Sequence, residues 1–300
     1  MSDAGVPPPA AAPLTLQNLL DDAVRRARGH FKEIYFPVAI PLAVLAALVP
    51  VVQLVAMRDF MSPGAMPTRP AQVFLAFGPM AIVVLVMVVV WALSYAALQV
   101  AATDAVAGRP VSMASAWGRV VQPRYFGTQI LSGLALLLGF CACLLPGIYL
   151  ALLWGVIVPV MVEEGRFGRE AMSRSAALLR HNPQGGLGND PRLKVFLIMF
   201  VGMVLQYVAS FIVQLPFVVV QQVLMFRSVS SGQRVDPGQM LAQMTWLNVP
   251  SQALGMLVQT AVQLYVAFGV ALLFFDARAR KEGTDLEAAI AGLAPSPPVP

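Results

Sequence analysis

The sequence predicts an all-α fold, a polytopic transmembrane helical bundle of six spans, on three observations. Hydrophobic residues make up 58% of the chain and charged residues 12%, whereas about a quarter of a soluble domain is charged. Several apolar runs exceed the roughly 18 to 20 residues that cross about 30 Å of hydrocarbon as a helix. The runs are continuous, while the strands of a membrane barrel alternate over about ten residues. We therefore expect helices that cross a membrane.

The predicted spans follow one another with short connections. They occupy residues 36–57, 73–103, 128–145, 147–162, 193–226 and 250–275. The third and fourth spans are short and meet at Pro146 and Gly147, which predicts a tight hairpin. Proline lacks a backbone donor and crowds the preceding turn of a helix. Kinks or interruptions are therefore expected at Pro41, Pro50, Pro79, Pro159 and Pro216.

The basic residues predict the orientation of the spans, because Lys and Arg are retained on the cytoplasmic side. With six spans, sixteen basic residues fall on the side that holds both termini and four on the other. The sixteen are Arg25, Arg26, Arg28, Lys32, Arg109, Arg119, Arg124, Arg166, Arg169, Arg174, Arg180, Arg192, Lys194, Arg278, Arg280 and Lys281. The four are Arg58, Arg69, Arg227 and Arg234. We expect a multi-pass protein of the bacterial cytoplasmic (inner) membrane with both termini in the cytoplasm.

One membrane domain is predicted, at residues 14–287, between two tails. Residues 1–13 and 288–300 are rich in Pro and Ala and offer little that a helix could bury. We expect both tails to be disordered. The first tail has no basic start followed by a short apolar core, so it is not expected to be a secretory signal peptide.

The predicted cytoplasmic connections contain three interfacial amphipathic helices. Their apolar positions are Leu16, Leu20, Ala23, Val24, Ala27, Phe31 and Ile34 in the first; Met113, Ala116, Trp117, Val120 and Val121 in the second; and Phe167, Ala171, Ser175 and Leu178 in the third. These positions recur at helical spacing, and Ser112 can cap the second helix. We expect each helix to lie at the membrane surface.

The three interfacial helices share a short pattern that predicts an internal repeat. It reads Ala23-x-x-Arg26, Ala116-x-x-Arg119 and Ala171-x-x-Arg174, and each copy precedes a pair of spans. The second span of each pair ends in an acidic residue followed by a basic one. Three repeats of interfacial helix plus membrane hairpin would produce this order. Convergence under the rule that places positive charge inside is the alternative explanation.

A repeat of this kind predicts a cytoplasmic charge layer in which the arginines approach the acidic ends of neighbouring hairpins. Its candidate members are Arg26, Asp104, Arg119, Glu163, Glu164, Arg174 and Asp276. Two interpretations compete. The charges orient the chain and stabilise helix ends, or the arginines hold the phosphates of anionic lipid headgroups, for which guanidinium geometry is suited.

Polar side chains at membrane depth form a second candidate site. The predicted intramembrane polar stripe consists of Gln206, Ser210 and Gln214 on the fifth span and Gln259 and Gln263 on the sixth. Each set recurs every four residues, and an unpaired amide in hydrocarbon is costly, so both sets should face the bundle interior. The stripe is either interhelical hydrogen bonding or a polar lining for a lipid headgroup or small neutral solute.

Several kinds of chemistry lack candidates in this sequence. We place His30 and His181, together with the acidic and basic groups, outside the apolar segments, which disfavours proton pumping and histidine catalysis. Cys141 and Cys143 are too close for an ordinary disulfide and have no second ligand pair, so they are expected to be packing residues. No catalytic, metal or cofactor site is predicted. The basic residues lie in short patches beside apolar runs, which favours a membrane surface over nucleic acid.

Two blocks of the chain resemble a known family. The first comprises Leu145-Pro146-Gly147-Ile148-Tyr149-Leu150, Glu164-Gly165-x-x-Gly168 and Ala171-Met172-Ser173-Arg174-Ser175, and the second runs from Phe275 to Glu287. The chain resembles uncharacterised bacterial polytopic proteins related to the membrane domain of glycerophosphoryl diester phosphodiesterase. The resemblance implies a six-helix membrane domain. It implies no activity, because the phosphodiesterase chemistry of the fused relatives belongs to a separate soluble barrel.

The leading functional hypothesis is a non-enzymatic membrane module that binds lipid, including anionic headgroups, or membrane protein partners. A solute permease or transporter subunit is the alternative, and a phospholipid-modifying enzyme is the second alternative. A permease predicts a continuous polar path between the fifth and sixth spans. A lipid-binding module predicts a lateral opening, and an enzyme needs convergent acid, base or metal ligands.

Overall fold

The computed structural model describes residues 15–58, 70–180, 190–230 and 237–293. Within these residues every regular element is a helix, in the order α1 to α10. The predicted tail at residues 1–13 lies outside the described residues. Helix α10 ends at Leu293, so residues 288–293 of the predicted C-terminal tail are helical, and residues 294–300 lie outside the described part.

Six helical segments are long and apolar enough to cross a membrane, which confirms the predicted bundle of six spans. They are α2 (Phe31–Arg58), α3 (Pro70–Val106), α5 (Pro123–Ala142), α6 with α7 (Leu144–Leu153 and Ile157–Glu164), α9 (Pro191–Ser230) and α10 (Pro237–Leu293). The protein is therefore a multi-pass integral membrane protein.

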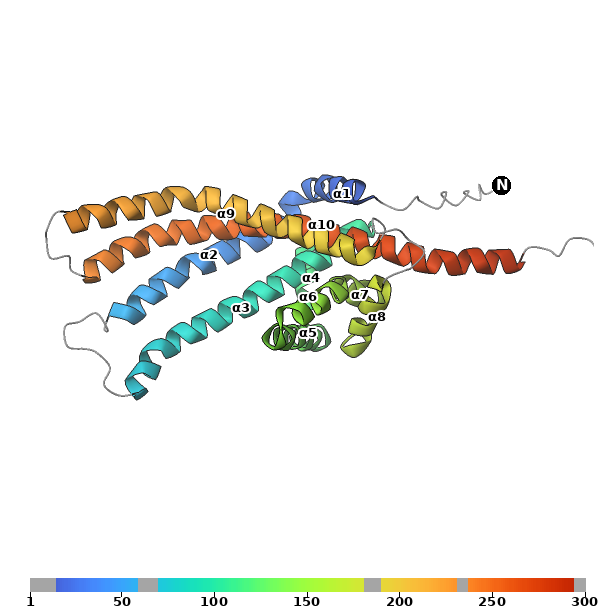
Figure 1. The fold of residues 1–300 in the computed structure, drawn as a ribbon, viewed down its shortest axis with the longest axis horizontal. Helices are drawn as coiled ribbons and strands as arrows, with labels where there is room; N and C mark the ends of the chain where they lie inside the picture. The colour runs from blue at the N-terminus through green and yellow to red at the C-terminus, as the bar shows by residue number, and fades with distance from the viewer. Residues whose placement is uncertain (1–14, 59–69, 181–189, 231–236, 294–300) are drawn as a thin grey trace, which may run out of the picture.

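The long helices α2, α3, α9 and α10 run along the molecule and spread apart toward one end (Figure 1). Three short helices, α1 (Leu16–Gly29), α4 (Met113–Val120) and α8 (Arg169–Leu179), gather toward the other end. We call this the charged end, because the ion pairs described below lie there. Helix α10 is central: it packs against α2, α3 and α9, and residues 267–274 are buried.

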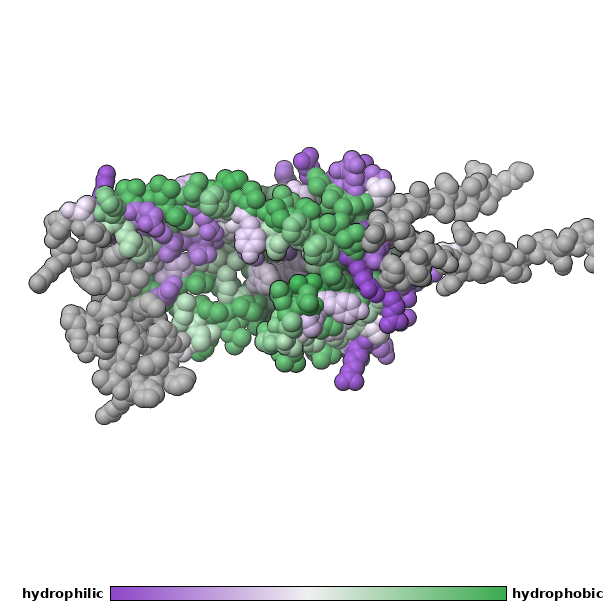
Figure 2. Space-filling view, in the orientation of Figure 1, coloured by the Kyte–Doolittle hydropathy of each residue, from purple (hydrophilic) through white to green (hydrophobic). Residues whose placement is uncertain are grey.

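The outer faces of the spans expose large apolar side chains. Ile82 and Leu85 on α3, Leu138 on α5 and Phe211 on α9 are each more than 60% exposed. Figure 2 shows hydrophobic surface over most of the length of α9 and over the α5–α6 pair, with hydrophilic surface at the charged end. Such a surface is stable only against lipid.

Small residues bring α9 and α10 close together. A Cβ atom at Gly202 would lie 2.4 Å from Cγ2 of Val266, and one at Gly269 would lie 3.1 Å from Cγ2 of Ile198. Membrane helices associate largely through such close packing, because lipid tails offer no hydrophobic driving force. The α9–α10 interface is consequently filled by side chains at these levels.

The fourth span is broken between α6 and α7. Helix α6 ends at Leu153, α7 begins at Ile157, and Pro159 occupies the first turn of α7. The proline ring would clash with the carbonyl of Gly155 in a continuous helix, so the break precedes it. The interruption expected at Pro159 is thus present. Helices α2, α3 and α9, by contrast, continue through Pro41, Pro50, Pro79 and Pro216. The hairpin between the third and fourth spans turns at the extended Cys143, and not at Pro146 and Gly147, which lie within α6.

The three predicted interfacial helices all form, as α1, α4 and α8. The side chains of Ala23, Ala116 and Ala171, which start the shared pattern, are buried in each case. Ser112 caps α4 by accepting a hydrogen bond from the backbone N–H of Ser115, as the sequence predicted. The alanines therefore face the protein interior.

Candidate functional site

Asp104, at the end of α3, binds two arginines that follow it in the chain. Arg109 donates from Nε to Oδ1 of Asp104 at 2.8 Å, and Arg119 on α4 donates to both oxygens of the carboxylate. Arg109 also pairs with Glu163 near the end of α7. The hydrogen bond with Glu163, reinforced by Asp104, raises the pKa of Arg109 further above its usual value. This cluster ties α3, α4 and α7 together.

Arg174 on α8 joins α7 to α10. Its Nε lies 2.9 and 2.8 Å from the two oxygens of Glu164, and its Nη2 lies 2.8 Å from Oε1 of Glu282. The chain reaches this position through Gly165, which ends α7 with a φ of 62°, a value that favours glycine. Two carboxylates that are far apart in sequence, Glu164 and Glu282, therefore bind one guanidinium.

Lys194 and Asp276 form a deeply buried ion pair between α9 and α10. The Lys194 side chain is 2% exposed and that of Asp276 is 8% exposed, with 3.4 Å between Nζ and Oδ2. Asp276 Oδ2 also lies 3.0 Å from Nη2 of Arg280. Sequence reasoning placed Lys194 in a connection and missed this pair. The available signal was a lysine just inside an apolar run, where a charge needs a partner.

Arg26 lies apart from the charge layer. It is exposed on α1, and no ion pair joins it to another described residue. The next residue, Ala27, is buried against the bundle. Successive side chains of an α-helix point about 100° apart, so Arg26 is turned away from that buried face. Arg119 and Arg174 pair with the acidic ends of the hairpins that precede them, whereas no hairpin precedes Arg26. Asp276, which could have closed the series, is bound to Lys194 and Arg280 instead.

The ion pairs argue against phosphate binding by the paired arginines. Arg119 and Arg174 already face carboxylates, and a lipid phosphate would have to displace these partners. Exposed basic side chains remain at the same end, namely Arg26, Arg28, Lys32, Arg124, Arg169 and Arg180. The paired groups hold helix ends together, and only the exposed groups are available to a lipid surface.

The predicted polar stripe is not a continuous path between α9 and α10. Gln206 donates to Ser210 one turn later on the same helix at 3.0 Å, and Gln214 is exposed beside Gly255. Gln259 and Gln263 are half-buried on α10. A side-chain hydrogen bond does join these helices elsewhere: Gln221 donates from Nε2 to Oδ1 of Asn248 at 2.8 Å. Sequence reasoning missed that pair, because neither residue belongs to the repeated spacing.

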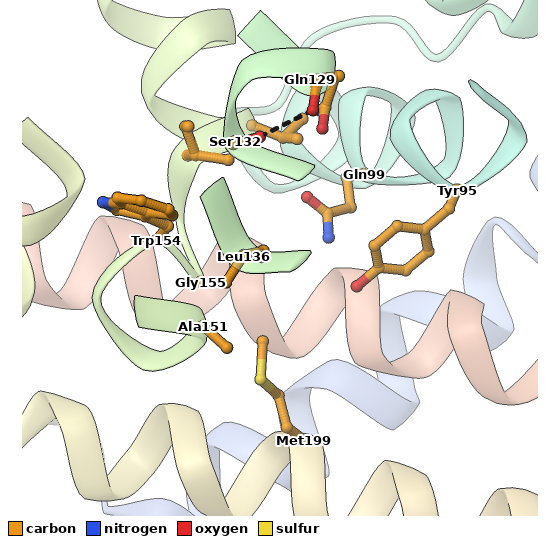
Figure 3. A pocket seen from close by; sticks show the side chains of 11 residues that line it. Tyr95, Gln99, Gln129, Ser132, Leu136, Ala151, Trp154, Gly155 and Met199 are labelled. Atoms are coloured by element: carbon orange, nitrogen blue, oxygen red, sulfur yellow. Dashed lines mark hydrogen bonds between the residues drawn. The ribbon is translucent and has the colours of Figure 1, made fainter. Parts of the chain in front are cut away.

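A cavity of about 170 Å³ lies between α3, α5, the α6–α7 break and α9. Figure 3 shows its lining side chains, and Figure 2 shows a hollow between α9 and the α5–α6 pair in this part of the molecule. The residues that line it are Tyr95, Gln99, Gln129, Ser132, Leu136, Ala151, Trp154, Gly155, Ile157, Val158 and Met199. Polar and apolar groups thus share one cavity, and none of its lining side chains is charged.

The break in the fourth span shapes the wall of this cavity. Ser175, buried on α8, donates a hydrogen bond from its hydroxyl to the carbonyl of Leu153 at 2.8 Å. This bond gives a partner to a carbonyl in the last turn of α6 that has none within the helix. Gly155 allows the chain to pass close to Val195 of α9, since a Cβ there would lie 2.8 Å from its Cγ1. The broken segment places Trp154 and Ile157 at the cavity, and α8 supports it from the charged end.

Side chains suited to metal binding do not gather in the described residues. Within those residues, no group of three or more His, Cys, Asp or Glu side chains is placed to hold an ion. Cys141 and Cys143 are free thiols exposed at the end of α5. The uncharged cavity and the internally paired charge layer are the two sites that remain.

Comparison with known proteins gives no relative. No family model, no curated protein and no solved structure matches the chain. The resemblance to the membrane domain of glycerophosphoryl diester phosphodiesterase therefore stays a prediction from the two sequence blocks.

Proposed function

We propose that this chain is a non-enzymatic module of the membrane that binds a lipid in the cavity beside α5. The observation that carries the proposal is an uncharged cavity of mixed polarity within the spans. Lipids combine a hydrogen-bonding head with apolar chains, and this lining offers a surface for both parts. The cavity residues Gln99 and Ser132 supply polar groups, and Leu136 and Met199 supply apolar surface.

The packing of α5 supports entry of a lipid from the side. Helix α5 packs mainly against α6, with smaller contacts to α4 and α8. The wall formed by the α5–α6 pair is thus attached to α3 and α9 less firmly than those helices are to α10. A lipid arriving along the exposed apolar faces of α5 and α9 meets the cavity at that boundary.

The permease alternative has less structural support. Its predicted path lies between the fifth and sixth spans, but Gly202 and Gly269 bring α9 and α10 into close contact there. Gln206, the first member of the stripe, bonds within its own helix. At the levels of Gly202 and Gly269 this interface is packed rather than open.

Filling the cavity should remove the bound lipid. Ala151 lines the cavity, and Ala151→Phe adds an aromatic ring to a space of about 170 Å³. We expect native mass spectrometry of protein extracted in mild detergent to show a lipid adduct on the wild type and to lose it in this variant. Ala92→Phe, at an exposed position of α3, is the matched control and should keep the adduct. Equal adducts on all three proteins would contradict lipid binding in the cavity.

The proposed orientation places the charged end in the bacterial cytoplasm. It is supported by the sixteen basic residues assigned to that side, against four on the other. Reporters that are active on one side of the membrane can be fused after Arg69, Arg124, Gly186, Arg234 and Pro300. Fusions after Arg124, Gly186 and Pro300 should report the cytoplasm and the other two the exterior. An exterior signal after Gly186 would overturn the orientation.

A further inference from the structure

The lining of the cavity restricts the charge of its ligand. None of the eleven lining residues carries a charge near neutral pH, because the phenol of Tyr95 stays protonated there. Asp104 on α3 and Glu163 on α7, each five residues from a lining residue, are bound to arginines, and Lys194 on α9, five residues before Met199, pairs with Asp276. Arg124, five residues before Gln129 on α5, is exposed and does not line the cavity. A charged headgroup in this cavity would lose its water without gaining an opposite charge. An uncharged headgroup carries no such penalty.

The hydrogen-bonding groups favour a ligand with hydroxyl and carbonyl groups. Gln99 is 5% exposed, and Figure 3 shows its amide directed into the cavity beside the phenol of Tyr95. Ser132 donates to the backbone carbonyl of Gln129 at 3.1 Å, which leaves its oxygen able to accept a hydrogen bond. The lining therefore offers donors and acceptors at neighbouring positions, as a hydroxyl group requires.

The size and depth of the cavity point to a small headgroup. Its volume of about 170 Å³ is close to the roughly 150 Å³ of an apolar cavity that holds benzene, a molecule of six heavy atoms. Gln99 and Tyr95 precede Asp104 by five and nine residues, which places them about 8 to 14 Å from the charge layer along α3. Phosphate headgroups stay at the membrane surface, whereas a glycerol unit is small enough to sit deeper.

We infer that the cavity takes the glycerol headgroup of an uncharged acylglycerol, such as diacylglycerol, with the acyl chains lying along α5 and α9. The inference rests on the proposed lipid-binding function and names its ligand class. Gln99 and Ser132 bind the free hydroxyl and an ester carbonyl of the headgroup. Phosphatidic acid, which adds one phosphate to the same molecule, is excluded by its charge.

The test compares dioleoylglycerol with dioleoylphosphatidic acid, titrated into the delipidated full chain in a neutral detergent and followed by native mass spectrometry. Dioleoylglycerol should bind at least about tenfold more tightly, because the phosphate would be buried unpaired. Gln99→Leu should weaken dioleoylglycerol binding about tenfold by removing hydrogen bonds to the headgroup. Gln222→Leu, at an exposed amide of α9 that belongs to neither candidate site, should leave it unchanged. If Gln99→Leu fails to fold, Ser132→Ala is measured instead with the same expectation.

The outcomes separate the ligand class from the function. Phosphatidic acid binding as tightly as dioleoylglycerol, and lost in Ala151→Phe, would overturn the ligand class and leave lipid binding in the cavity standing. An unchanged affinity for dioleoylglycerol in Gln99→Leu would also overturn the headgroup assignment. Binding of neither lipid, with no adduct on the wild type, would overturn the function itself.

Discussion

Asp276→Asn is expected to lower the free energy of unfolding by about 3 to 5 kcal/mol, the range for breaking a buried ion pair. Lys194 is 2% exposed and lies 3.4 Å from this carboxylate, so its ammonium would face a neutral amide of the same shape. Arg280, the other cation at Asp276, is 31% exposed and can turn toward water. Reversible unfolding of the detergent-purified protein by sodium dodecyl sulfate measures the change.

The control for this prediction is a carboxylate at the same end of the molecule that is open to solvent. Glu33 is 66% exposed and lies 3.4 Å from His30. Glu33→Gln should change the free energy of unfolding by no more than about 0.5 kcal/mol, as is usual for surface positions. If the two substitutions had equal effects, the Lys194–Asp276 pair would not be a stabilising contact between α9 and α10.

Arg174→Ala is expected to cost about 2 kcal/mol of stability, between the 0 to 1 of a surface pair and the 3 to 5 of a buried one. The Arg174 side chain is 22% exposed, but its main partner Glu164 is 8% exposed and would keep only Arg166, whose Nε lies 3.2 Å from Oε2. The same substitution removes one of the two arginine partners of Glu282 on α10, which keeps Arg278 at 2.8 Å. Unfolding in the same detergent mixture measures the loss.

Arg169→Ala is the matched control, since Arg169 is an exposed arginine in the first turn of the same helix. It should leave stability nearly unchanged. Arg174→Lys should restore only part of the loss, because one ammonium cannot reproduce a planar group that faces two oxygens of Glu164 and one of Glu282. A full effect in Arg169→Ala would show that the charge of α8, and not the specific pairing of Arg174, matters.

The features that depend on local sequence were predictable. Continuous apolar runs predicted the six spans, because in lipid each span must form a helix to hydrogen-bond its own backbone N–H and C=O groups. The spacing of Ala23 and Ala27, and of Ala116 and Val120, predicted the buried faces of α1 and α4. Two of the proposed arginine contacts, Arg119 with Asp104 and Arg174 with Glu164, join elements that are close neighbours in the chain.

The features that depend on distant segments were not predictable from one sequence. Lys194 and Asp276 are 82 residues apart, and nothing in either local pattern indicates the other. The cavity is a space left between α3, α5, the α6–α7 break and α9. The helical periodicity of each segment does not predict such a space. The position of the break at Gly155 depends on the contact with Val195 and on the hydroxyl of Ser175 as well as on Pro159.

Photo-crosslinking tests lipid binding in the cavity most directly. Analogues of diacylglycerol and of phosphatidic acid, each with a photoreactive diazirine near its headgroup, are incorporated separately with the full chain into nanodiscs, and the adducts of both are mapped by peptide mass spectrometry. The lipid-binding function predicts adducts at the cavity residues of α5 and at Trp154, and their loss in Ala151→Phe. Adducts spread along the exposed apolar faces of α3 and α9, and unchanged in Ala151→Phe, would contradict it.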